Sequence, residues 1–492
     1  MPADALDHEV VIIGGGFSGI GAAIELDRAG FGDLLIVEEG DGVGGAWHWN
    51  TYPGVGVDIP SFSYQFSFEQ RSDWSRVYAK GDELKAYAER CVDSYGLRDR
   101  IRLNTRVVSG SFDDDTDSWT LGLSDGSSLR SRHVVVATGV LTQPKLPDID
   151  GVADFAGVTM HSARWDHSVD LAGKRVGIIG TGASAVQVIP TIAPSVADLV
   201  VFQRTPIWCL PKPDRALTWP ARRLLGLPGA KSVARLVSEI FVELNFPIPA
   251  HFYGNIPLTD AVEKLGLRFL KQQVRDPETR EKLTPKYGLG CKRPSFSNAY
   301  LAAYNRENVH LETTSIKRVT PTGVETVDGT HHDLDVLILA TGFKVFEKGN
   351  MPPIPVTGSR GADLDAFWAE NRFQAFQGVS VPGFPNAFLI LGPYGFNGAS
   401  YFNLIETQSR HIVRTLREAR KRRATRVEVT PEANTAYFEK MLKRRPNQVF
   451  FREACSTANS YYFDDRGDVP LRPSLTLEAR WEAERFPLDS YR

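Results

Sequence analysis

Short apolar runs alternate with helical patterns at the start of the chain, the order expected for parallel strands joined by helices. The first run, residues 9–13, breaks into the turn Gly14-Gly15-Gly16-Phe17-Ser18-Gly19, and apolar positions at helical spacing then continue to about residue 29. A second apolar run, 34–37, ends in Glu38. Strand, glycine turn, helix, strand and acid in this order indicate a dinucleotide-binding unit.

Each of three glycines in this turn has a separate physical task. Gly14 allows the tight turn, Gly16 lets the backbone approach a pyrophosphate, and Gly19 lets the helix pack closely on the strand. The helix N-terminus favours the phosphates, because its free N–H groups and its dipole attract an anion. Glu38 stands nineteen residues after Gly19, where a carboxylate can accept hydrogen bonds from a ribose, and an acid there argues against a 2′-phosphate.

A second unit of the same kind follows. The apolar run 175–179 leads into Gly180-Thr181-Gly182-Ala183-Ser184-Ala185, in which Ala185 replaces the third glycine. The next apolar run, 199–202, ends in Gln203-Arg204-Thr205 instead of an acid. Arg204 can pair with a 2′-phosphate, so this unit is expected to prefer NADP(H). A solvated surface charge is the alternative interpretation of Arg204. Two units predict two bound dinucleotides.

Between the glycine turns, residues 42–58 are too rich in glycine and aromatic residues for regular structure, and we expect them to wrap a ligand. Residues 73–95 have the pattern of an amphipathic helix. Residues 101–136 read as short strands, with turns at 113–115 and 125–126.

Two apolar runs, 133–136 and 336–339, each end in Ala-Thr-Gly. Such small residues suit a close approach of backbone to a cofactor, and their position suggests that the chain passes between the two units there. The proline-containing connector 143–147 is interpreted as a hinge. The run 387–391 predicts a third crossing.

Residues 211–283 carry helical patterns at 234–244 and 260–274 and no nucleotide motif, so we interpret them as a helical insertion. Its apolar patches, 240–242 and 246–249, could meet a hydrophobic substrate or a membrane surface, although a buried helical core is the favoured interpretation.

The predicted fold class is therefore α/β, with two Rossmann-like dinucleotide-binding domains and a helical insertion. Residues 1–142 and 385–492 are assigned to the first domain, 143–210 and 284–384 to the second, and 211–283 to the insertion.

Composition narrows the function classes. The 492 residues suffice for roughly three domains of about 150 residues. The 57 basic and 59 acidic residues give a formal net charge of −2, which does not point to nucleic acid. No apolar run reaches the roughly 18 residues of a spanning helix, and residues 1–8 contain no Lys or Arg, so a soluble, cytoplasmic protein without membrane contact is expected.

The four cysteines are far apart and form no CxxC pair. This spacing argues against a disulfide framework, a zinc ribbon and a dithiol redox centre, and it fits a reducing compartment. No metal site is predicted.

Two longer motifs carry a family resemblance. The pattern F-x-G-x-x-x-H-x-x-x-W-(P/D) is met by Phe155, Gly157, His161, Trp165 and Asp166. The pattern (A/G)-G-x-W-x(4)-(F/Y)-P-(G/M)-x(3)-D is met by Gly44, Gly45, Trp47, Tyr52, Pro53, Gly54 and Asp58. With both motifs and two nucleotide units, the sequence resembles the Baeyer–Villiger monooxygenases, a family of class B flavoprotein monooxygenases.

The resemblance implies FAD in the first domain and NADPH in the second. It also implies a catalytic Arg293, positioned by Asp58, and an NADP phosphate held by Lys292, Arg204 and Thr205. The residues expected to bind the two cofactors are Gly14, Gly16, Gly19, Glu38, Gly45, Trp47, Asp58, Gly180, Gly182, Ala185, Arg204, Thr205 and Lys292. His161 is given a structural or domain-coupling role.

In such enzymes NADPH reduces FAD, O₂ adds at the flavin C4a carbon, and the deprotonated peroxide attacks a carbonyl, so that a ketone becomes an ester or lactone. Sulfides are a further possible substrate class. The peroxide and the tetrahedral adduct are both anions, and a guanidinium can stabilise them without supplying a proton that would release hydrogen peroxide.

The chain departs from the family near its end. Many members carry a Ser-Trp segment that lines the substrate pocket, whereas this chain has Asn459-Ser460-Tyr461-Tyr462-Phe463. A pocket role for Tyr461 or Tyr462 is therefore a hypothesis.

Three other functions remain open from the sequence. The first is a class B oxygenase acting on nitrogen or sulfur, which the Trp165-Asp166 ending argues against. The second is a flavin and NADPH reductase that does not oxygenate, and the third is a peripheral membrane protein that uses the apolar stretch 240–249.

Overall fold

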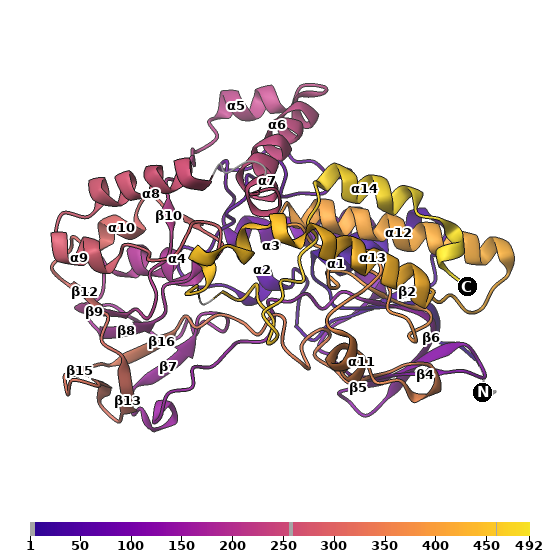
Figure 1. The fold of residues 1–492 in the computed structure, drawn as a ribbon, viewed down its shortest axis with the longest axis horizontal. Helices are drawn as coiled ribbons and strands as arrows, with labels where there is room; N and C mark the ends of the chain where they lie inside the picture. The colour runs from indigo at the N-terminus through magenta and orange to yellow at the C-terminus, as the bar shows by residue number, and fades with distance from the viewer. Residues whose placement is uncertain (1–4, 255–258, 459) are drawn as a thin grey trace.

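The computed structural model describes residues 5–254, 259–458 and 460–492. Two lobes lie side by side, each built on a sheet, and helices cover the upper side of both (Figure 1). Within these ranges no helix is long and apolar enough to cross a bilayer.

The first sheet has, among the described residues, eight strands in the order β17-β4-β5-β6-β1-β2-β3, with β18 also paired to β6. Its strands are β1 (His8–Ile13), β2 (Leu34–Val37), β3 (Ile101–Arg102), β4 (Val107–Asp113), β5 (Ser118–Leu123), β6 (Ser128–Val136), β17 (Val356–Thr357) and β18 (Ala387–Leu389). β1 runs parallel to β2 and β6, and its last four residues are nearly inaccessible because helices and strands cover both faces.

Helices of the first lobe come from both ends of the chain. They are α1 (Phe17–Arg28), α2 (Ala46–Trp49), α3 (Gly81–Ser94), α11 (Leu364–Asn371), α12 (Tyr401–Arg422), α13 (Pro431–Arg444) and α14 (Thr476–Arg485). α12 packs along α1 and α14 packs along α12, so the C-terminal part of the chain completes the core that the first fifty residues begin.

The second sheet has the order β12-β9-β8-β16-β7 and is parallel throughout. Its strands and helices are β7 (Val158–His161), β8 (Arg175–Ile179), α4 (Ala183–Ile192), β9 (Asp198–Phe202), α10 (Tyr300–Ala303), β12 (Val309–Glu312) and β16 (Val336–Leu339). A three-stranded antiparallel sheet of β13 (Ile316–Thr320), β14 (Gly323–Thr326) and β15 (His331–Asp333) extends this lobe. A mixed sheet, in which only the pairs β4–β5 and β5–β6 are antiparallel among the described residues, and a parallel sheet, each with covering helices, confirm the predicted α/β fold class.

The helical insertion is confirmed as helical. It contains α5 (Trp219–Leu225), α6 (Ala230–Asn245), α7 (Pro247–His251), α8 (Thr259–Gln273) and α9 (Pro277–Lys282). Two short strands, β10 (Cys209–Leu210) and β11 (Ser295–Phe296), pair where the chain enters and leaves it. The expectation of a buried apolar core at 240–242 is wrong for Ile240 and Phe241, which are exposed, while Val242 is buried.

The helix predicted over residues 73–95 is shorter than expected, because residues 73–80 are irregular and α3 begins at Gly81. Glu83, in the first turn of α3, accepts hydrogen bonds from the N–H and the hydroxyl of Ser75, each at 2.7 Å. The Trp74 indole is fully buried and donates to the Gln65 side chain at 3.1 Å. These contacts fold the preceding residues back over the helix start.

The two connectors between the lobes run antiparallel beside each other. Pro144 bridges Phe343, and the Lys145 N–H donates to the Gly342 carbonyl at 2.9 Å. Lys145 also forms an ion pair with Glu347 at 2.5 Å. The predicted hinge and the predicted return of the chain after 336–339 thus form one two-stranded link.

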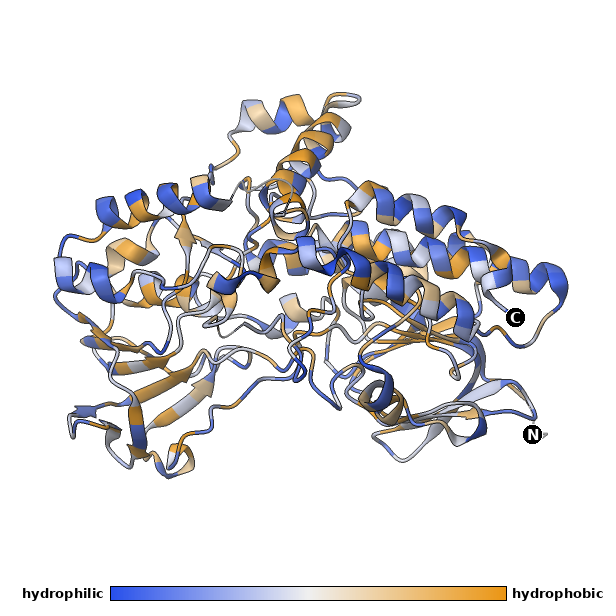
Figure 2. Ribbon diagram, viewed as in Figure 1, coloured by the Kyte–Doolittle hydropathy of each residue, from blue (hydrophilic) through white to orange (hydrophobic). Residues whose placement is uncertain are grey.

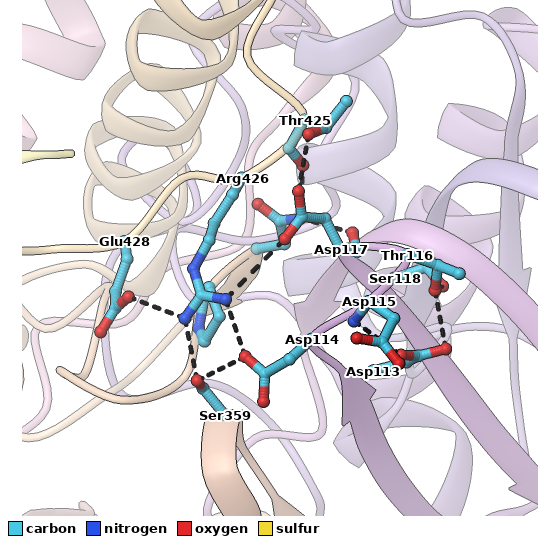
Figure 3. Close-up of polar contacts among 12 residues, drawn as sticks. Asp113, Asp114, Asp115, Thr116, Asp117, Ser118, Ser359, Thr425, Arg426 and Glu428 are labelled. Atoms are coloured by element: carbon cyan, nitrogen blue, oxygen red, sulfur yellow. Dashed lines mark hydrogen bonds and ion pairs between the residues drawn. The ribbon is translucent and has the colours of Figure 1, made fainter.

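One predicted boundary conflicts with the sheet pairing. β17 pairs in parallel with β4, although the predicted division leaves residues up to 384 in the second domain. Figure 3 shows how this segment is held: Arg426 pairs with Asp114 at 2.8 Å and with Glu428 at 3.2 Å, and the Ser359 hydroxyl donates to Asp114 at 2.6 Å. The chain has therefore returned to the first lobe by residue 356; the other boundaries stay predictions.

The cysteine expectation needs a correction. Cys291 and Cys455, 164 residues apart, form a disulfide with their Cα atoms 5.1 Å apart, which their sequence spacing did not reveal. Cys91 and Cys209 are free and buried, and burial raises the pKa of each thiol to about 12. Within the described residues no group of His, Cys, Asp and Glu side chains could hold a metal ion.

Candidate active site and nucleotide sites

The first glycine turn lies where β1 ends beside β6. Gly14 has φ +110°, and a Cβ added to it would stand 2.7 Å from the Ala137 carbonyl oxygen, in the first Ala-Thr-Gly tripeptide. A Cβ on Gly19 would stand 1.9 Å from the Gly14 oxygen, so the start of α1 packs directly on the turn. Only glycine fits at these two positions.

The Glu38 side chain is held against the same turn. It is only 6 % exposed, and its two carboxylate oxygens accept the N–H groups of Gly15 at 2.5 Å and Gly40 at 2.7 Å. Charge-assisted hydrogen bonds of this kind fix the carboxylate at the carboxyl end of β2, next to the predicted dinucleotide.

The predicted wrapping loop, residues 42–58, does lie over this turn. The Gly44 N–H donates to the Gly15 carbonyl at 3.0 Å, and a Cβ on Gly45 would stand 2.9 Å from the Gly16 Cα. Gly45 has φ +56°. Trp47 lies in α2 within this loop. The loop therefore closes over the glycine turn with backbone against backbone.

The same loop reaches the second lobe. Gln187 of α4 accepts hydrogen bonds from the Tyr52 hydroxyl at 3.1 Å and from the Gly56 N–H at 3.3 Å, and it donates to the Gly56 carbonyl at 2.9 Å. A Cβ on Gly54 would stand 2.5 Å from the Thr191 hydroxyl. One loop thus contacts both nucleotide units.

The two sequence signatures contact each other, although they are about a hundred residues apart. The Arg164 guanidinium lies 4.3 Å from the centre of the Trp49 ring, and His167 Nε2 is 2.8 Å from the Thr51 hydroxyl. His161 is buried at the end of β7, with its ring 6.2 Å from that of Phe343 in the connector. Burial lowers the pKa of His161, with help from the Arg164 charge. This placement supports the domain-coupling interpretation of His161.

The second glycine turn has the same backbone geometry. Gly180 has φ +111°, and a Cβ on it would stand 2.5 Å from the Ala340 carbonyl oxygen, in the second Ala-Thr-Gly tripeptide. Ala185, in place of the third glycine, is fully buried. The Thr181 hydroxyl donates to the Thr205 carbonyl at 2.9 Å. A Cβ on Gly182 would meet nothing within 4 Å, so this turn is open.

Two cations lie together near the open turn. Burial, and next to it the charge of Arg204, lower the pKa of Lys292 to about 8. Arg204 is exposed, and Lys292 is half-buried. Among the described residues neither forms an ion pair with an acid, although the chain contains more acids than bases. Two adjacent, unneutralised cations favour a multiply charged anion.

Arg293 pairs with Asp58, at the end of the long signature. Arg293 Nε donates to Asp58 Oδ2 at 2.8 Å. Burial acts to raise the pKa of Asp58, but the Arg293 charge and hydrogen bond, with Lys212, bring that pKa below its usual value. Burial acts to lower the pKa of Arg293, and the Asp58 charge raises it well above its usual value. Both groups are charged over the whole physiological pH range.

Aromatic side chains surround this pair. The Arg293 guanidinium lies 5.6 Å from the centre of the Phe246 ring, at the end of α6. The Tyr462 hydroxyl is buried without a well-formed hydrogen bond; burial raises its pKa, and the charge of Arg293 acts in the opposite direction. Burial also raises the pKa of Tyr401 to about 12, again opposed by Arg293. Asn459, which precedes this segment, lies outside the described residues.

Sequence reasoning missed several residues of this site. Gln187 and Lys212 stand alone in their segments, and Lys212 donates to the Val57 carbonyl at 2.9 Å just before Asp58. Neither belongs to a motif, so no local signal identified them. Phe246 was part of an apolar patch that the sequence connected only loosely with a substrate.

The residues present suit two dinucleotides. Gly16 and Gly182 are the N-caps of α1 and α4, and neither helix start is capped by a side chain. The N-terminal amides are therefore available to phosphate oxygens at both turns. The acid at the first turn suits an unphosphorylated ribose, and the cations at the second suit a phosphorylated one.

Comparisons with known proteins agree with this arrangement. A family model described as "Pyridine nucleotide-disulphide oxidoreductase" matches residues 11–215. A Baeyer-Villiger monooxygenase of Pseudomonas aeruginosa is 35% identical, covering 100% of this chain and 92% of that protein. One of Streptomyces coelicolor is 35% identical, covering 98% of this chain and 92% of the relative.

Solved structures are similar over nearly the whole chain. A crystal structure of OTEMO in complex with FAD and NADP has a TM-score of 0.89 and 28% identity, covering 99% of each chain. The closed crystal structure of cyclohexanone monooxygenase has a TM-score of 0.88 and 30% identity, covering 99% of this chain and 98% of that one.

Proposed function

The chain belongs to the Baeyer–Villiger monooxygenases, and from this premise we propose that Arg293 and Asp58 form the catalytic pair of an enzyme that inserts oxygen beside a ketone carbonyl. The enzyme is an FAD- and NADPH-dependent monooxygenase. When bound, FAD supplies the activation of O₂ and NADPH supplies the electrons.

The observation that carries the catalytic proposal is the 2.8 Å pair between Arg293 and Asp58, which joins two segments 235 residues apart. Nε is committed to the carboxylate, which leaves the other guanidinium donors to face substrate oxygen. A guanidinium stabilises negative charge as it develops on that oxygen, and it does not give up a proton. Asp58 fixes the orientation of Arg293 and balances its charge in a partly buried site.

The first turn is proposed to hold FAD. Gly14, Gly16 and Gly19 bring backbone and helix N-terminus to the pyrophosphate, and Glu38 orients the ribose end. Gly45 and Trp47, on the loop over this turn, would limit the access of water to the flavin.

The second turn is proposed to hold NADPH. Gly180, Gly182 and Ala185 form the pyrophosphate cradle at the start of α4, and the 2′-phosphate is placed between Arg204 and Lys292, with Thr205 beside it. The openness at Gly182 supports a nucleotide that enters and leaves during each reaction cycle.

Phe246 and Tyr462 are proposed to line the substrate pocket, because both lie next to Arg293. Their rings favour an apolar ketone, and the buried Tyr462 hydroxyl can donate to an oxygen placed beside the guanidinium. We extend the substrate proposal to sulfides, whose lone pair can accept the same oxygen atom.

Substitution of Arg293 tests the catalytic proposal. With cyclohexanone as the probe, Arg293→Ala is expected to lower lactone formation roughly 10²- to 10³-fold, the size found for losing a preorganised donor to a developing oxyanion. NADPH consumption should continue and yield hydrogen peroxide. Lactone would be measured by gas chromatography and peroxide by a coupled peroxidase assay.

Arg293→Lys is the matched variant, since it keeps a positive charge but loses the forked donors. It should recover only part of the lactone yield. Lactone formation at the parent rate in Arg293→Ala would contradict the catalytic role of Arg293. If Arg293→Ala lost its bound flavin together with lactone formation, the Arg293–Asp58 pair would instead have a purely structural role. Conversion of methyl phenyl sulfide by the parent enzyme tests the sulfide extension separately.

A further inference from the structure

Helix α6 is oriented with its apolar side outward. Its residues Val233, Leu236, Val237 and Ile240 follow the spacing of one helix face and are each more than half exposed, with Val237 at 62 %. The side that faces the protein carries the buried Arg235 and Ser238. A helix at the surface of a soluble protein normally has the opposite orientation.

The buried polar residues of α6 explain why the helix cannot turn over. Arg235 donates to the Asn403 side chain at 2.6 Å, and the Ser238 hydroxyl bonds the Ser63 hydroxyl at 2.7 Å. Rotating α6 to bury its apolar face would break these hydrogen bonds and leave their partners, Asn403 and the buried Ser63, without them. The outward apolar face is therefore a fixed feature of the fold.

The apolar surface continues beyond α6. Trp219 and Leu224 of α5 and Leu227 in the following turn are also more than half exposed. In Figure 1 α5 and α6 project from the top of the molecule between the two lobes, and Figure 2 shows that α6 is largely hydrophobic in colour. We call the set Trp219, Leu224, Leu227, Val233, Leu236, Val237 and Ile240 the α5–α6 face.

The charge around the α5–α6 face is strongly one-sided. Between Asp214 and Glu239 the sequence has no acid and five bases, whereas the whole chain has a net charge of −2. Four of these bases, Arg215, Arg222, Arg223 and Lys231, are at least partly exposed, while the fifth, Arg235, is buried on the protein-facing side of α6. The Arg223 guanidinium lies 4.9 Å from the centre of the Trp219 ring, so a cation and an interfacial aromatic residue stand together at the edge.

From these observations we propose that the α5–α6 face docks in the plane of an anionic lipid membrane surface. An apolar helix face with flanking Arg and Lys residues and a Trp at its edge has the composition of helices that lie in the headgroup region. The bases would contact lipid phosphates while the apolar side chains enter the acyl boundary. This proposal departs from the sequence-based expectation of no membrane contact.

The charge pattern favours lipid over a second copy of the chain. A two-fold contact would place the same patch on both partners, so that bases would oppose bases with no acid between Asp214 and Glu239 to neutralise them. The projection of the two helices from the body also suits a flat partner better than another curved surface.

The docked helix would lead toward the candidate active site. α6 ends at Asn245, and its next residue, Phe246, lies over Arg293. An apolar ketone dissolved in the lipid would thus enter near the residue that we place at the pocket. This last step rests on the proposed function, whereas the docking itself does not.

The test measures binding to vesicles without substrate. The full-length enzyme with bound flavin is sedimented with vesicles of phosphatidylcholine alone or of phosphatidylcholine mixed with phosphatidylglycerol. We expect sedimentation with the anionic vesicles that weakens as salt is added. The triple variant Leu236→Ser, Val237→Ser, Ile240→Ser should lower the partition coefficient roughly tenfold or more. The double variant Arg222→Gln, Arg223→Gln should lower it roughly fivefold for each charge.

Matched controls lie on the far β-hairpin of the second lobe. Val327→Ser removes an equally exposed apolar side chain, and Lys317→Gln, Arg318→Gln removes the same charge as the arginine pair. Both controls should bind vesicles as the parent does. Flavin absorbance and thermal unfolding of each variant confirm that it is folded.

Two results would overturn the proposal. One is a parent enzyme that stays in the supernatant with anionic vesicles, or a triple variant that binds them equally well. The other is a parent that dimerises in solution and binds no vesicles, with a monomeric triple variant, since the α5–α6 face would then be a contact between two copies. A parent enzyme that binds anionic vesicles but forms no lactone from a ketone would count against the proposed function alone.

Discussion

Two glycine turns with nearly identical backbones stand in very different surroundings. Gly14 and Gly180 have φ +110° and +111°, and each lies against the alanine carbonyl of an Ala-Thr-Gly tripeptide. The first turn is covered by the loop 42–58 and its acid is buried, whereas the second is open at Gly182 and its Arg204 is exposed. On the proposed assignment, each turn positions a phosphate group, and the surroundings of the turn set which dinucleotide binds and how readily it exchanges.

The largest expected effect on stability is at the third glycine position of the first turn, Gly19. Gly19→Ala would place a Cβ 1.9 Å from the Gly14 oxygen, so the backbone must shift and we expect a loss of about 3 kcal/mol or more in the free energy of unfolding. Flavin should be lost from the purified protein. Flavin absorbance and denaturant unfolding measure both effects. A yellow variant of parent stability would show that the α1 packing on this turn is looser than described.

Arg204 gives the second turn a positive charge, whereas the first turn has the acid Glu38. Arg204→Ala removes a charge-assisted hydrogen bond to the proposed 2′-phosphate, so NADPH should bind about 2–3 kcal/mol more weakly. NADH, which lacks that phosphate, should bind as before. Rates of flavin reduction at varied concentrations of each nucleotide give the comparison. Equal weakening for both nucleotides would place Arg204 outside the phosphate site.

Glu38 tests the covered turn in the same way. Glu38→Gln keeps the shape but leaves the N–H of Gly15 or Gly40 without a charged acceptor, and we expect it to cost about 1–2 kcal/mol in stability. Thermal unfolding with and without added FAD measures this. Glu39→Gln, at an exposed neighbour, is the control and should leave the unfolding temperature unchanged. An equal effect of both changes would remove the special role of Glu38.

The pH dependence of NADPH binding sharpens the comparison further. The pKa of Lys292 is lowered to about 8, so its ammonium is charged below that pH and becomes neutral above it. The affinity for NADPH should therefore fall as pH rises through about 8, by about fivefold if one charge contact of about 1 kcal/mol is lost. Titration by fluorescence in the absence of substrate would follow it. A parallel decline for NADH would point to another group.

The smallest effect is expected at Ala185. Ala185→Gly makes the second turn resemble the first at its third position, but it removes only a buried methyl group and loosens the start of α4. We expect a loss of about 0.5–1 kcal/mol in stability, with NADPH binding nearly unchanged. Together with Gly19→Ala, it measures how differently the two helix starts pack. A large loss of NADPH affinity would mean that the methyl group shapes the cradle.

Local patterns predicted those parts of the fold that are buried on both sides. The runs 34–37, 175–179 and 336–339 are strands with those bounds in the structure, because strands in the middle of a parallel sheet read as uninterrupted apolar segments. The two glycine turns were found for a similar reason, since each requires residue types that little else can replace.

Other features depend on contacts that no pattern carries. Periodicity predicted a helix at 234–244, within α6, but not that Arg235 and Ser238 would face inward, because that choice is made by Asn403 and Ser63 from distant segments. The disulfide of Cys291 with Cys455 was hidden in the same way. Gln187, which holds the loop 42–58 to α4, belongs to no motif.

On the proposed placement of the two nucleotides, the loop 42–58 also couples their binding affinities. It rests on the first turn through Gly44, is held by the second lobe through Gln187, and ends at Asp58 beside Arg293. A segment ordered by two ligands makes their affinities mutually dependent, and the factor is the same in either direction. On the proposed placement of FAD and NADPH, any stabilisation of this loop by one nucleotide therefore raises the affinity for the other by the same factor.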